Sequence, residues 1–439
     1  MEKKRSMRFL ALAASAVLAL CGMTACGGEN NGDAGNGGNN TENKSEEEAA
    51  TTTTEATTMP VAEVKSPTAD VKIGLICLHD ESSTYDLNFI NSLETAKKDL
   101  KLTDDQIIIK RNIPEGTECK DAASELAQSG CNIVFADSFG HESFMLEAAK
   151  EFPDVHFCHA TGTLAHTEKL PNYHNAFAAI YEGRYLTGVA AGMKLKEMID
   201  FGKITPDKAV MGYVGAFTYA EVISGYTAFY LGAKSVCPSV TMKVQFTGSW
   251  YDEAEEKKAA ENLINEGCVL ISQHADSMGA PSACEAAGIP NVSYNGSTME
   301  ACPNTYIVSS RIDWAPYYEY MINSYIHGDN IEYDWVGNVY TNSIQMNAVN
   351  TEIAASDTKD TLESIREQLK EGSLHVFDTA KFTVDGKKLD SYMADVDTDP
   401  DFTPDTEVIK DGYFHESEFR SAPYFDIRID GITTLNEKF

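Results

Sequence analysis

Short apolar runs alternate with amphipathic stretches along the chain from residue 71 onward. The first series predicts strands at residues 71–78, 106–112, 131–137 and 155–161, separated by helices near residues 88–100, 117–129 and 142–151. The second series predicts strands at residues 209–217, 240–246, 268–274 and 290–296, separated by helices at residues 221–236 and 252–267 and a short one ending at Gly288. Apolar strands that alternate with helices indicate parallel sheets covered on both faces, so the pattern predicts two α/β domains.

One helix of the second series is explained by its sequence, but the residue before it is not. Asp252 and Glu255 have the spacing of a capping box, which satisfies the first free N–H groups, and Gly267 ends the helix. Trp250, one of three tryptophans, lies in the turn between the preceding strand and this cap. Either its ring packs under its own helix or it lines a binding site, and its place at a strand end favours the second.

Several other polar and aromatic residues also follow predicted strands. In parallel α/β sheets, ligands bind beyond the carboxyl ends of the strands, so residues at these ends are candidates for one shared cleft. The candidates are Asp80, Ser138, Phe139, Phe217, Trp250, Asp276 and Asn295. The aspartates could equally cap helices or remain solvated, and Ser138 could equally be a turn residue.

A second aromatic candidate, Phe89, lies in the first helix of the other domain. Phe89 and Trp250 could hold a flat ligand between two rings when the domains close, because aromatic groups gain from stacking. Core packing of the first helix explains Phe89 equally well, so both interpretations stand.

The N-terminus has the pattern of an export signal. Residues 1–9 are cationic, residues 9–20 are apolar but too short to span a bilayer, and GMTAC ends at Cys26. A small residue before a cysteine resembles the lipobox of bacterial lipoproteins, which predicts a signal peptide at residues 1–25 and a lipidated Cys26. An ordinary secretory signal with an incidental cysteine is the alternative. We find no second segment suited to crossing a membrane, so a lipid anchor is the only membrane attachment expected.

Residues 26–69 are rich in Gly, Asn, Thr and Glu. This composition buries too little apolar area to fold, so a disordered tether is expected. The formal net charge of the chain is −32, which argues against nucleic acid or an anionic membrane surface as a partner.

The cysteines are expected to be mostly free thiols. Of the ten, Cys21 leaves with the signal and Cys26 is the lipid site, which leaves eight. Several of these lie in apolar, strand-like runs, where a buried thiol behaves as a small hydrophobic group. An exported chain also permits disulfides, so their pairing stays open for Cys77, Cys119, Cys131, Cys158, Cys237, Cys268, Cys284 and Cys302.

A resemblance to a known family is carried by segments that occur in a fixed order, including FADSFGHESF, GYVGAF, TGSWYDEAEEKKAAENLINEG, ISQHADS and SRIDWAPYY. Together they resemble the basic membrane protein family of ABC-transporter substrate-binding lipoproteins, and the match covers nearly the whole folded part. The resemblance implies a type I periplasmic-binding-protein fold whose two lobes hold a purine nucleoside or free purine base. The pattern QH-x-DS and a tryptophan at position 250 are similar to adenine-binding members.

The resemblance also implies roles for single residues. Asp80 and Phe89 keep the spacing of the family's first aspartate and stacking phenylalanine, and Trp250 matches the opposing aromatic wall. Ser138 and Phe139 lie in the loop that matches the one after the third strand. Asp276 lies in the matching loop of the second series.

Two departures bear on the ligand. The chain has Asn295 where nucleoside binders have an aspartate, and Asp313 where they have a lysine that helps to hold ribose. Loss of that lysine favours a free base. Carboxylates at Asp80, Asp276 and Asp313 can accept hydrogen bonds from purine N–H groups, and Asn295 can donate or accept.

An enzyme is the competing class of function. Ser272, His274 and Asp276 lie too close together on one strand end to form a nucleophilic triad. His156 and Cys158 share one face of a strand, but His159 lies on the other, which does not favour zinc. No phosphate-binding glycine motif occurs in the folded part. We therefore predict no catalysis, no cofactor and no metal.

The sequence thus predicts a monomeric lipoprotein on the outer face of the cell membrane that closes two lobes on a purine-like ligand. It would deliver that ligand to an ABC permease and its ATPase; a co-receptor of a membrane sensor is the alternative. Lobe 1 is predicted at residues 70–205 plus 303–330 and lobe 2 at residues 206–302 plus 331–439, joined by three crossovers. The mechanism would be hinge closure, with the ligand bridging both lobes.

Overall fold

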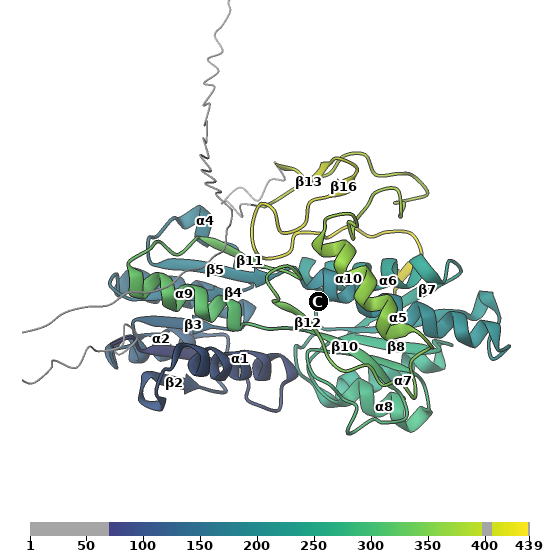
Figure 1. Cartoon of the computed structure of the whole chain (residues 1–439), viewed down its shortest axis with the longest axis horizontal. Helices are drawn as coiled ribbons and strands as arrows, with labels where there is room; N and C mark the ends of the chain where they lie inside the picture. Colours follow the sequence, from purple (N-terminus) through teal and green to yellow (C-terminus); the bar gives the residue numbers. More distant parts are fainter. Residues whose placement is uncertain (1–69, 397–405, 438–439) are drawn as a thin grey trace, which may run out of the picture. The chain divides into compact units, whose positions relative to one another are not determined.

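The chain folds around two sheets, which define two lobes (Figure 1). The computed structural model describes residues 70–396 and 406–437. The predicted signal peptide, Cys26 and the whole of the predicted tether therefore lie outside the described residues. None of the described helices is both long and apolar enough to cross a membrane.

Lobe 1 has a six-stranded sheet in which all neighbours are parallel. The strand order is β11-β5-β4-β3-β1-β2, with β1 Ile73–Ile76, β2 Ile107–Lys110, β3 Ile133–Ala136, β4 His156–Ala160, β5 Tyr173–Ala178 and β11 Asp334–Gly337. Its helices are α1 Thr84–Leu100, α2 Thr117–Gln128, α3 Glu142–Glu151, α4 Ala165–Glu168 and α9 Ala315–His327, with short 3-10 helices η1 Asp104–Gln106 and η2 Phe139–His141.

Lobe 2 has a seven-stranded sheet of order β12-β10-β9-β8-β6-β7-β17, parallel except where β12 meets β10. The strands are β6 Val210–Gly215, β7 Thr241–Phe246, β8 Leu270–His274, β9 Asn291–Tyr294, β10 Tyr306–Ile312, β12 Ile344–Met346 and β17 Ile432–Thr434. The helices are α5 Ile180–Asp200, α6 Ala220–Val236, α7 Glu253–Asn265, α8 Gly279–Ala287 and α10 Thr358–Lys370, with the 3-10 helix η3 Pro206–Lys208. The predicted α/β class with two doubly wound lobes is confirmed.

The chain crosses between the sheets three times, as predicted, but at other positions. It crosses between β5 and α5, between β10 and α9, and between β11 and β12. Strand β10 therefore belongs to lobe 2 and β11 to lobe 1, so the predicted boundaries at residues 205, 302 and 330 are displaced. The backbone N–H of Ala179 donates to the carbonyl of Gly337 at 2.7 Å, so the first and third crossings touch.

Helix α5 lies in lobe 2 because it packs closely against α6. A Cβ atom on Gly188 of α5 would lie 2.0 Å from the carbonyl oxygen of Phe229, and one on Gly232 of α6 would lie 2.1 Å from that of Tyr185. Only glycine permits this approach of the two backbones. The predicted boundary at residue 205 places this helix in lobe 1. A close contact between glycines leaves no hydrophobic periodicity in the sequence, so the pattern does not indicate the partner of the helix.

The apolar composition of the central strands and the free state of the cysteines both agree with their burial. All four residues of β1 and of β3 are buried, which matches apolar strands covered on both faces. In the described part of the chain all eight cysteines are buried, free thiols, as predicted.

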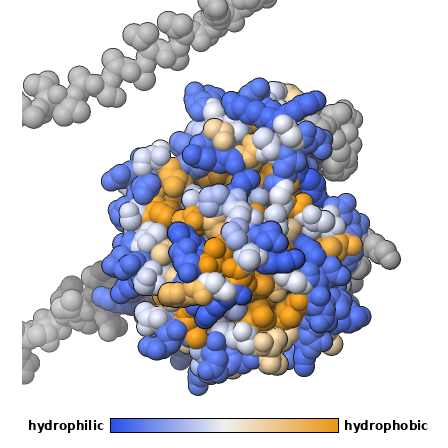
Figure 2. Space-filling model, turned by 90° about the vertical axis from the view of Figure 1, so that its right-hand side faces the viewer, coloured by the Kyte–Doolittle hydropathy of each residue, from blue (hydrophilic) through white to orange (hydrophobic). Residues whose placement is uncertain are grey.

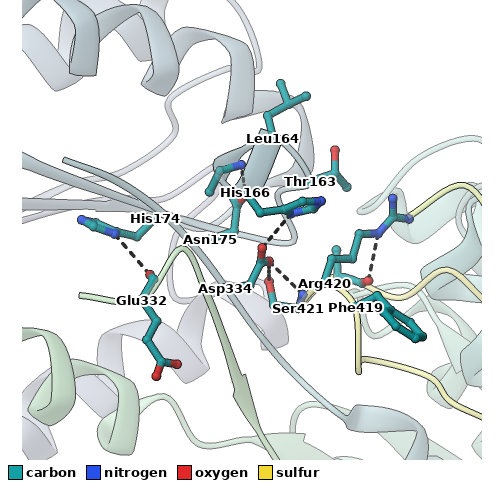
Figure 3. Close-up of polar contacts among 12 residues, drawn as sticks. Thr163, Leu164, His166, His174, Asn175, Glu332, Asp334, Phe419, Arg420 and Ser421 are labelled. Carbon is teal, nitrogen blue, oxygen red and sulfur yellow. Dashed lines mark hydrogen bonds and ion pairs between the residues drawn. The ribbon is translucent and has the colours of Figure 1, made fainter. Parts of the chain in front are cut away.

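A C-terminal segment, residues 371–396 and 406–437, follows α10 and returns to the sheet of lobe 2 through β17. It contains two small antiparallel pairs, β13 Met393–Ala394 with β14 Thr406–Glu407 and β15 Ile409–Lys410 with β16 Tyr413–Phe414. Figure 3 shows where it meets lobe 1: the backbone N–H and the Oγ of Ser421 donate to Oδ1 of Asp334 at 2.8 and 2.7 Å. Nδ1 of His166 lies 2.8 Å from the other oxygen of Asp334. One carboxylate of β11 thus fastens the segment to lobe 1.

The surface drawn in Figure 2 has orange, apolar patches near its centre and blue, hydrophilic residues around most of its rim. Apolar atoms contribute more than half of the surface of ordinary folded proteins, so such patches alone do not indicate a partner site.

Candidate functional site

A cavity lies at the carboxyl ends of strands from both sheets. Lobe 1 lines it with residues after β1, β3 and β4 and from the start of α1. Lobe 2 lines it with residues after β7, β8 and β9 and from the start of α6. The lining side chains are Leu78, His79, Tyr85, Asp86, Ser138, Phe139, Thr161, Glu221, Trp250, His274, Asp276 and Tyr294.

The two lobes touch beside this cavity. The backbone N–H and the hydroxyl of Thr84, at the start of α1, donate to the carbonyl of Asp276 at 3.3 and 3.2 Å. Nδ2 of Asn88 donates to Oδ1 of Asn295 at 3.2 Å. These bonds join the first helix of lobe 1 to two loops of lobe 2, so the cavity has walls on both sides.

Trp250 lines the cavity from the turn before α7. The helix begins as predicted, because the Asp252 carboxylate accepts from the N–H of Glu255 at 3.0 Å. The backbone N–H of Asp252 donates to Oε1 of Glu256 at 3.1 Å, and not to Glu255 as a capping box would require. The carbonyl of Trp250 accepts from the N–H of Asp276 at 3.0 Å, which fixes the turn against the loop after β8.

Aromatic rings cluster at one side of the cavity, where Phe139 and Trp250 line it and Tyr219 and Phe217 pack beside them. Phe139 of lobe 1 stacks on Tyr219 of lobe 2 with 5.0 Å between centroids, and Phe217 stacks on the same tyrosine at 5.0 Å. The Trp250 ring meets Phe217 edge-on at 5.0 Å. Phe217 thus supports Trp250 from behind and is not among the residues that line the cavity.

Ser138 lines the cavity through a firmly held loop. Its hydroxyl donates to Oε1 of Glu115 at 2.6 Å, and its carbonyl lies 2.7 Å from Nε2 of His159. The loop after β3 therefore presents Ser138 and Phe139 in fixed positions.

Asp276 also lines the cavity, and it is almost fully buried. Oδ1 accepts from Nδ2 of Asn295 at 3.2 Å. Burial, together with the nearby charge of Asp86, raises the pKa of Asp276 well above its usual range. A protonated Asp276 can donate a hydrogen bond as well as accept one. Asn295 lies behind it and faces a separate groove.

Phe89 does not line the cavity, so its predicted role as a stacking wall finds no support in the geometry. Its side chain is fully buried and stacks on Trp314 with 4.3 Å between centroids. The physical reason is the spacing of α1: Phe89, Leu93 and Ala96 share one helical face, which packs onto the sheet. Core packing, the alternative interpretation, holds.

Asp80 and Asp313 also lie away from the cavity lining. Oδ1 of Asp80 accepts from the N–H and the hydroxyl of Ser82 at 3.0 and 2.7 Å, and these hydrogen bonds lower its pKa to about 2. Asp313 accepts from the hydroxyl of Ser92 and from the N–H of Ala315, both at 3.1 Å, where the chain crosses into α9. Both aspartates hold turns, so neither prediction of a ligand contact finds support.

Asp86 lines the cavity in front of a second buried carboxyl group, Asp137. Cys77, Asp86 and Asp137 are the one group among the described residues with three potential metal-ligand atoms within 4.8 Å of each other. Burial raises the pKa of Asp137 and of the Cys77 thiol well above their usual ranges. Burial also opposes ionisation of Asp86, but hydrogen bonds from His79 and Ser83 outweigh it and lower its pKa. The raised pKa of Asp137 favours its protonated form, which can donate a hydrogen bond to the Asp86 carboxylate. Asp86 then presents a carboxylate to the cavity.

Residues 74–377 match the family model of the PnrA-like ABC transporter substrate-binding proteins. The chain belongs to this family. The match confirms the resemblance predicted from the sequence motifs and extends over both lobes. The C-terminal segment lies almost wholly beyond residue 377.

Relatives of this substrate-binding chain carry different ligand names. A purine-binding protein of Brucella abortus is 34% identical over 207 residues, which are 47% of this chain and 55% of the relative. A Haloferax volcanii protein named for glucose binding in ABC transport is 32% identical over 260 residues, 59% of this chain and 62% of the relative. The chain thus spans little more than half the length of these curated relatives.

A solved structure supports the fold. The solute-binding protein of an ABC transporter system from Conexibacter woesei superposes with a TM-score of 0.56 at 20% identity, over 70% of this chain and 98% of that one. At this identity the similarity shows the fold alone, which is the predicted type I periplasmic-binding-protein architecture.

Several cavity residues of this family member were missed by the sequence analysis. His274 lies between two partners: Nε2 is 3.3 Å from Oε1 of Glu221, and Nδ1 is 3.4 Å from the hydroxyl of Tyr213. Burial, reinforced by the Arg184 charge, lowers the pKa of His274 to about 4, so it is neutral and orients the Glu221 carboxylate. The Arg184 guanidinium carbon lies 3.3 Å from the ring centroid of Tyr294, which supports that cavity wall. Glu221 and Arg184 begin helices, where the sequence shows only ordinary helical polarity.

Proposed function

We propose that the protein is the extracytoplasmic solute-binding lipoprotein of an ABC importer and captures a purine base between its lobes. The cavity is the observation that supports this most. It joins flat walls from Trp250 and Tyr85 to carboxyl groups from both lobes, Asp86, Glu221 and Asp276. A member of this family with such a cavity suits a planar ligand with several N–H donors.

The protonation of the cavity suits a purine edge, which carries both donors and acceptors. The Asp86 carboxylate accepts, while a protonated Asp276 donates or accepts. The two groups come from different lobes, so one base can bond to both. A ligand that bonds to both lobes binds the closed state more tightly than the open state. It therefore favours closure, which is the proposed hinge mechanism.

The remaining parts of the proposal concern the cell. Lipidation at Cys26, a tether at residues 26–69, a monomeric body and delivery to a permease with its ATPase all remain proposals. The Brucella relative supports the purine ligand, and the Haloferax relative makes a sugar the competing ligand. A thermal-shift screen with purine bases, nucleosides and glucose tests the class, because a ligand that binds only the folded state raises stability by RT ln(1 + [L]/Kd). Stabilisation by glucose alone would replace the purine assignment.

Free purine bases are expected to bind about tenfold more tightly than their nucleosides, a difference of about 1.4 kcal/mol. None of the lining residues is a lysine or arginine, and Asp313, at the position of the ribose lysine, bonds to Ser92 instead. Calorimetry with adenine and adenosine measures the difference. Tighter binding of the nucleoside by a similar factor would reverse the assignment.

The substitution Cys26→Ser is expected to release a folded, ligand-competent protein from the membrane fraction. The predicted anchor and the cavity occupy separate parts of the chain, so losing one should leave the other intact. Fractionation of cells and a thermal shift on the released protein check both halves. A variant that stays in the membrane fraction contradicts the lipobox.

A further inference from the structure

A second pocket, of about 220 Å³, lies where the C-terminal segment covers the start of α5. We call it the hinge pocket; α5 lines it with Tyr181 and Glu182, and the chain after α10 lines it with residues that include His375, Tyr413 and Glu416. Oε2 of Glu182 accepts from the N–H of Val339, near the third crossing, at 2.8 Å. The pocket therefore lies against two of the three crossings and apart from the purine cavity.

Three carboxyl groups, of Glu182, Glu416 and Glu418, line the hinge pocket, and none of the described residues that line it is a lysine or arginine. Glu418 pairs with Nδ1 of His415, which leaves Glu182 and Glu416 for a ligand. Glu416 is only 6% exposed; Oε1 accepts from the N–H of Tyr424 at 2.9 Å, but Oε2 has no hydrogen-bond partner among the described residues. A buried carboxyl oxygen without a partner is costly, and a ligand that donates to it would remove the cost.

The walls of the pocket are aromatic. His375, Tyr413 and His415 form a stack with 3.7 and 3.9 Å between successive centroids and nearly parallel planes. Tyr181 packs on Phe377 at 5.3 Å. The histidine rings cover both faces of Tyr413, so the aromatic surface open to a ligand is that of Tyr181 and Phe377. Tyrosine and phenylalanine faces attract organic cations through the negative charge of the ring face.

We infer that the hinge pocket binds a small organic cation, an alkyl amine or quaternary ammonium group, held by Glu416 and Glu182 against the rings of Tyr181 and Phe377. A metal ion fits less well, because the glutamates and histidines here do not form a set of three donor atoms within 4.8 Å, whereas Cys77, Asp86 and Asp137 do. This inference does not rest on the purine ligand.

The carboxyl groups of Glu416 and Glu182 should make the affinity for a cation depend on pH. Burial raises the pKa of Glu416 to about 8 and that of Glu182 to about 7. The Arg420 charge opposes the shift of Glu416 and Asp426 adds to it, while Arg366 opposes that of Glu182. The other titratable groups around them are Tyr181, Tyr424, His375, His415, Tyr413 and Glu418. A cation prefers the ionised carboxylates, so binding should release a proton and strengthen as pH rises through these values.

Calorimetry with putrescine and with tetramethylammonium tests the inference on the full-length protein without purine, below pH 7 and above pH 8. We expect saturable binding of one equivalent, tighter at the higher pH, and no binding of butane-1,4-diol. Glu416→Gln should weaken binding about tenfold, as expected when a charge-assisted contact is lost. Glu363→Gln, a change on the exposed face of α10, removes the same charge and should leave binding unchanged.

Equal weakening by both variants would mean general attraction to an acidic surface and would overturn the inference. Binding of Mg²⁺ with equal affinity, or no saturable binding at either pH, would also overturn it. If Glu416→Gln fails to fold, Glu182→Gln replaces it, since the amide oxygen still accepts from Val339. Adenine should not compete with putrescine. Amine binding without adenine binding would leave the hinge pocket standing and refute the purine proposal.

Discussion

Replacing Phe89 with alanine is expected to lower the free energy of unfolding by about 3–5 kcal/mol, the cost of a large cavity in a packed core. The ring is fully buried, stacks on Trp314 and packs against Phe135 at 5.5 Å. The core of lobe 1 cannot refill this space without moving Trp314. Urea denaturation measures the change, and an unaltered denaturant slope would show that the unfolded state is the same.

The matched control for this prediction is Phe201→Ala. Phe201 is 72% exposed, so its loss should change stability by no more than about 0.5 kcal/mol. Ligand affinity of the folded Phe89→Ala protein should stay close to that of the parent, because the ring touches the cavity only through Tyr85. A large loss of affinity at unchanged stability would restore the ligand-stacking role.

The fold was predictable because its signals are local. Apolar strands such as β1 and β3 are buried on both faces, and Asp252 begins α7 by a side-chain bond that its neighbours in sequence reveal. The order of strands and helices then limits the architecture to two α/β lobes. The crossings were not predictable from such signals, because whether β10 pairs with β9 or joins lobe 1 depends on distant partners.

The candidate site was predictable in part for the same reason. Four of the residues predicted at the carboxyl ends of strands line one cavity: Ser138, Phe139, Trp250 and Asp276. The rule fails for Asp80, which follows β1 but turns back to bond to Ser82.

Residues that reach the cavity from the first turn of a helix have no sequence pattern that predicts a ligand contact. Asp86 and Glu221 look like ordinary first-turn acids, which favour helix N-termini anyway. Only the burial of Asp86 against Asp137 reveals its different setting, and burial by a partner far along the chain leaves no local trace. Phe89 keeps the spacing of the family's stacking phenylalanine, but its ring packs into the core. Spacing in the sequence therefore does not show whether a side chain faces the cavity.

Replacing Trp250 with alanine is expected to weaken ligand binding by about 1–3 kcal/mol, the range for stacking of a base on an aromatic ring. The ring lines the cavity and packs on Phe217 with 5.0 Å between centroids, which fixes its position beside the ligand. Unfolding of the ligand-free protein should change less than in the Phe89 variant, because Trp250 is only partly buried. Trp250→Phe should recover most of the affinity, since it keeps an aromatic face on the same turn.

Trp335→Ala provides the matched control for loss of a tryptophan. Trp335 lies in β11, packs on Tyr317 at 5.0 Å and does not line the cavity, so its loss should reduce stability and leave affinity unchanged. Unfolding and calorimetry on both variants therefore separate packing from ligand contact. If Trp250→Ala instead lost about 3–5 kcal/mol of stability and kept its affinity, the ring would be a core anchor. The stacking role would then pass to Tyr85 or Tyr294, the other rings of the cavity wall.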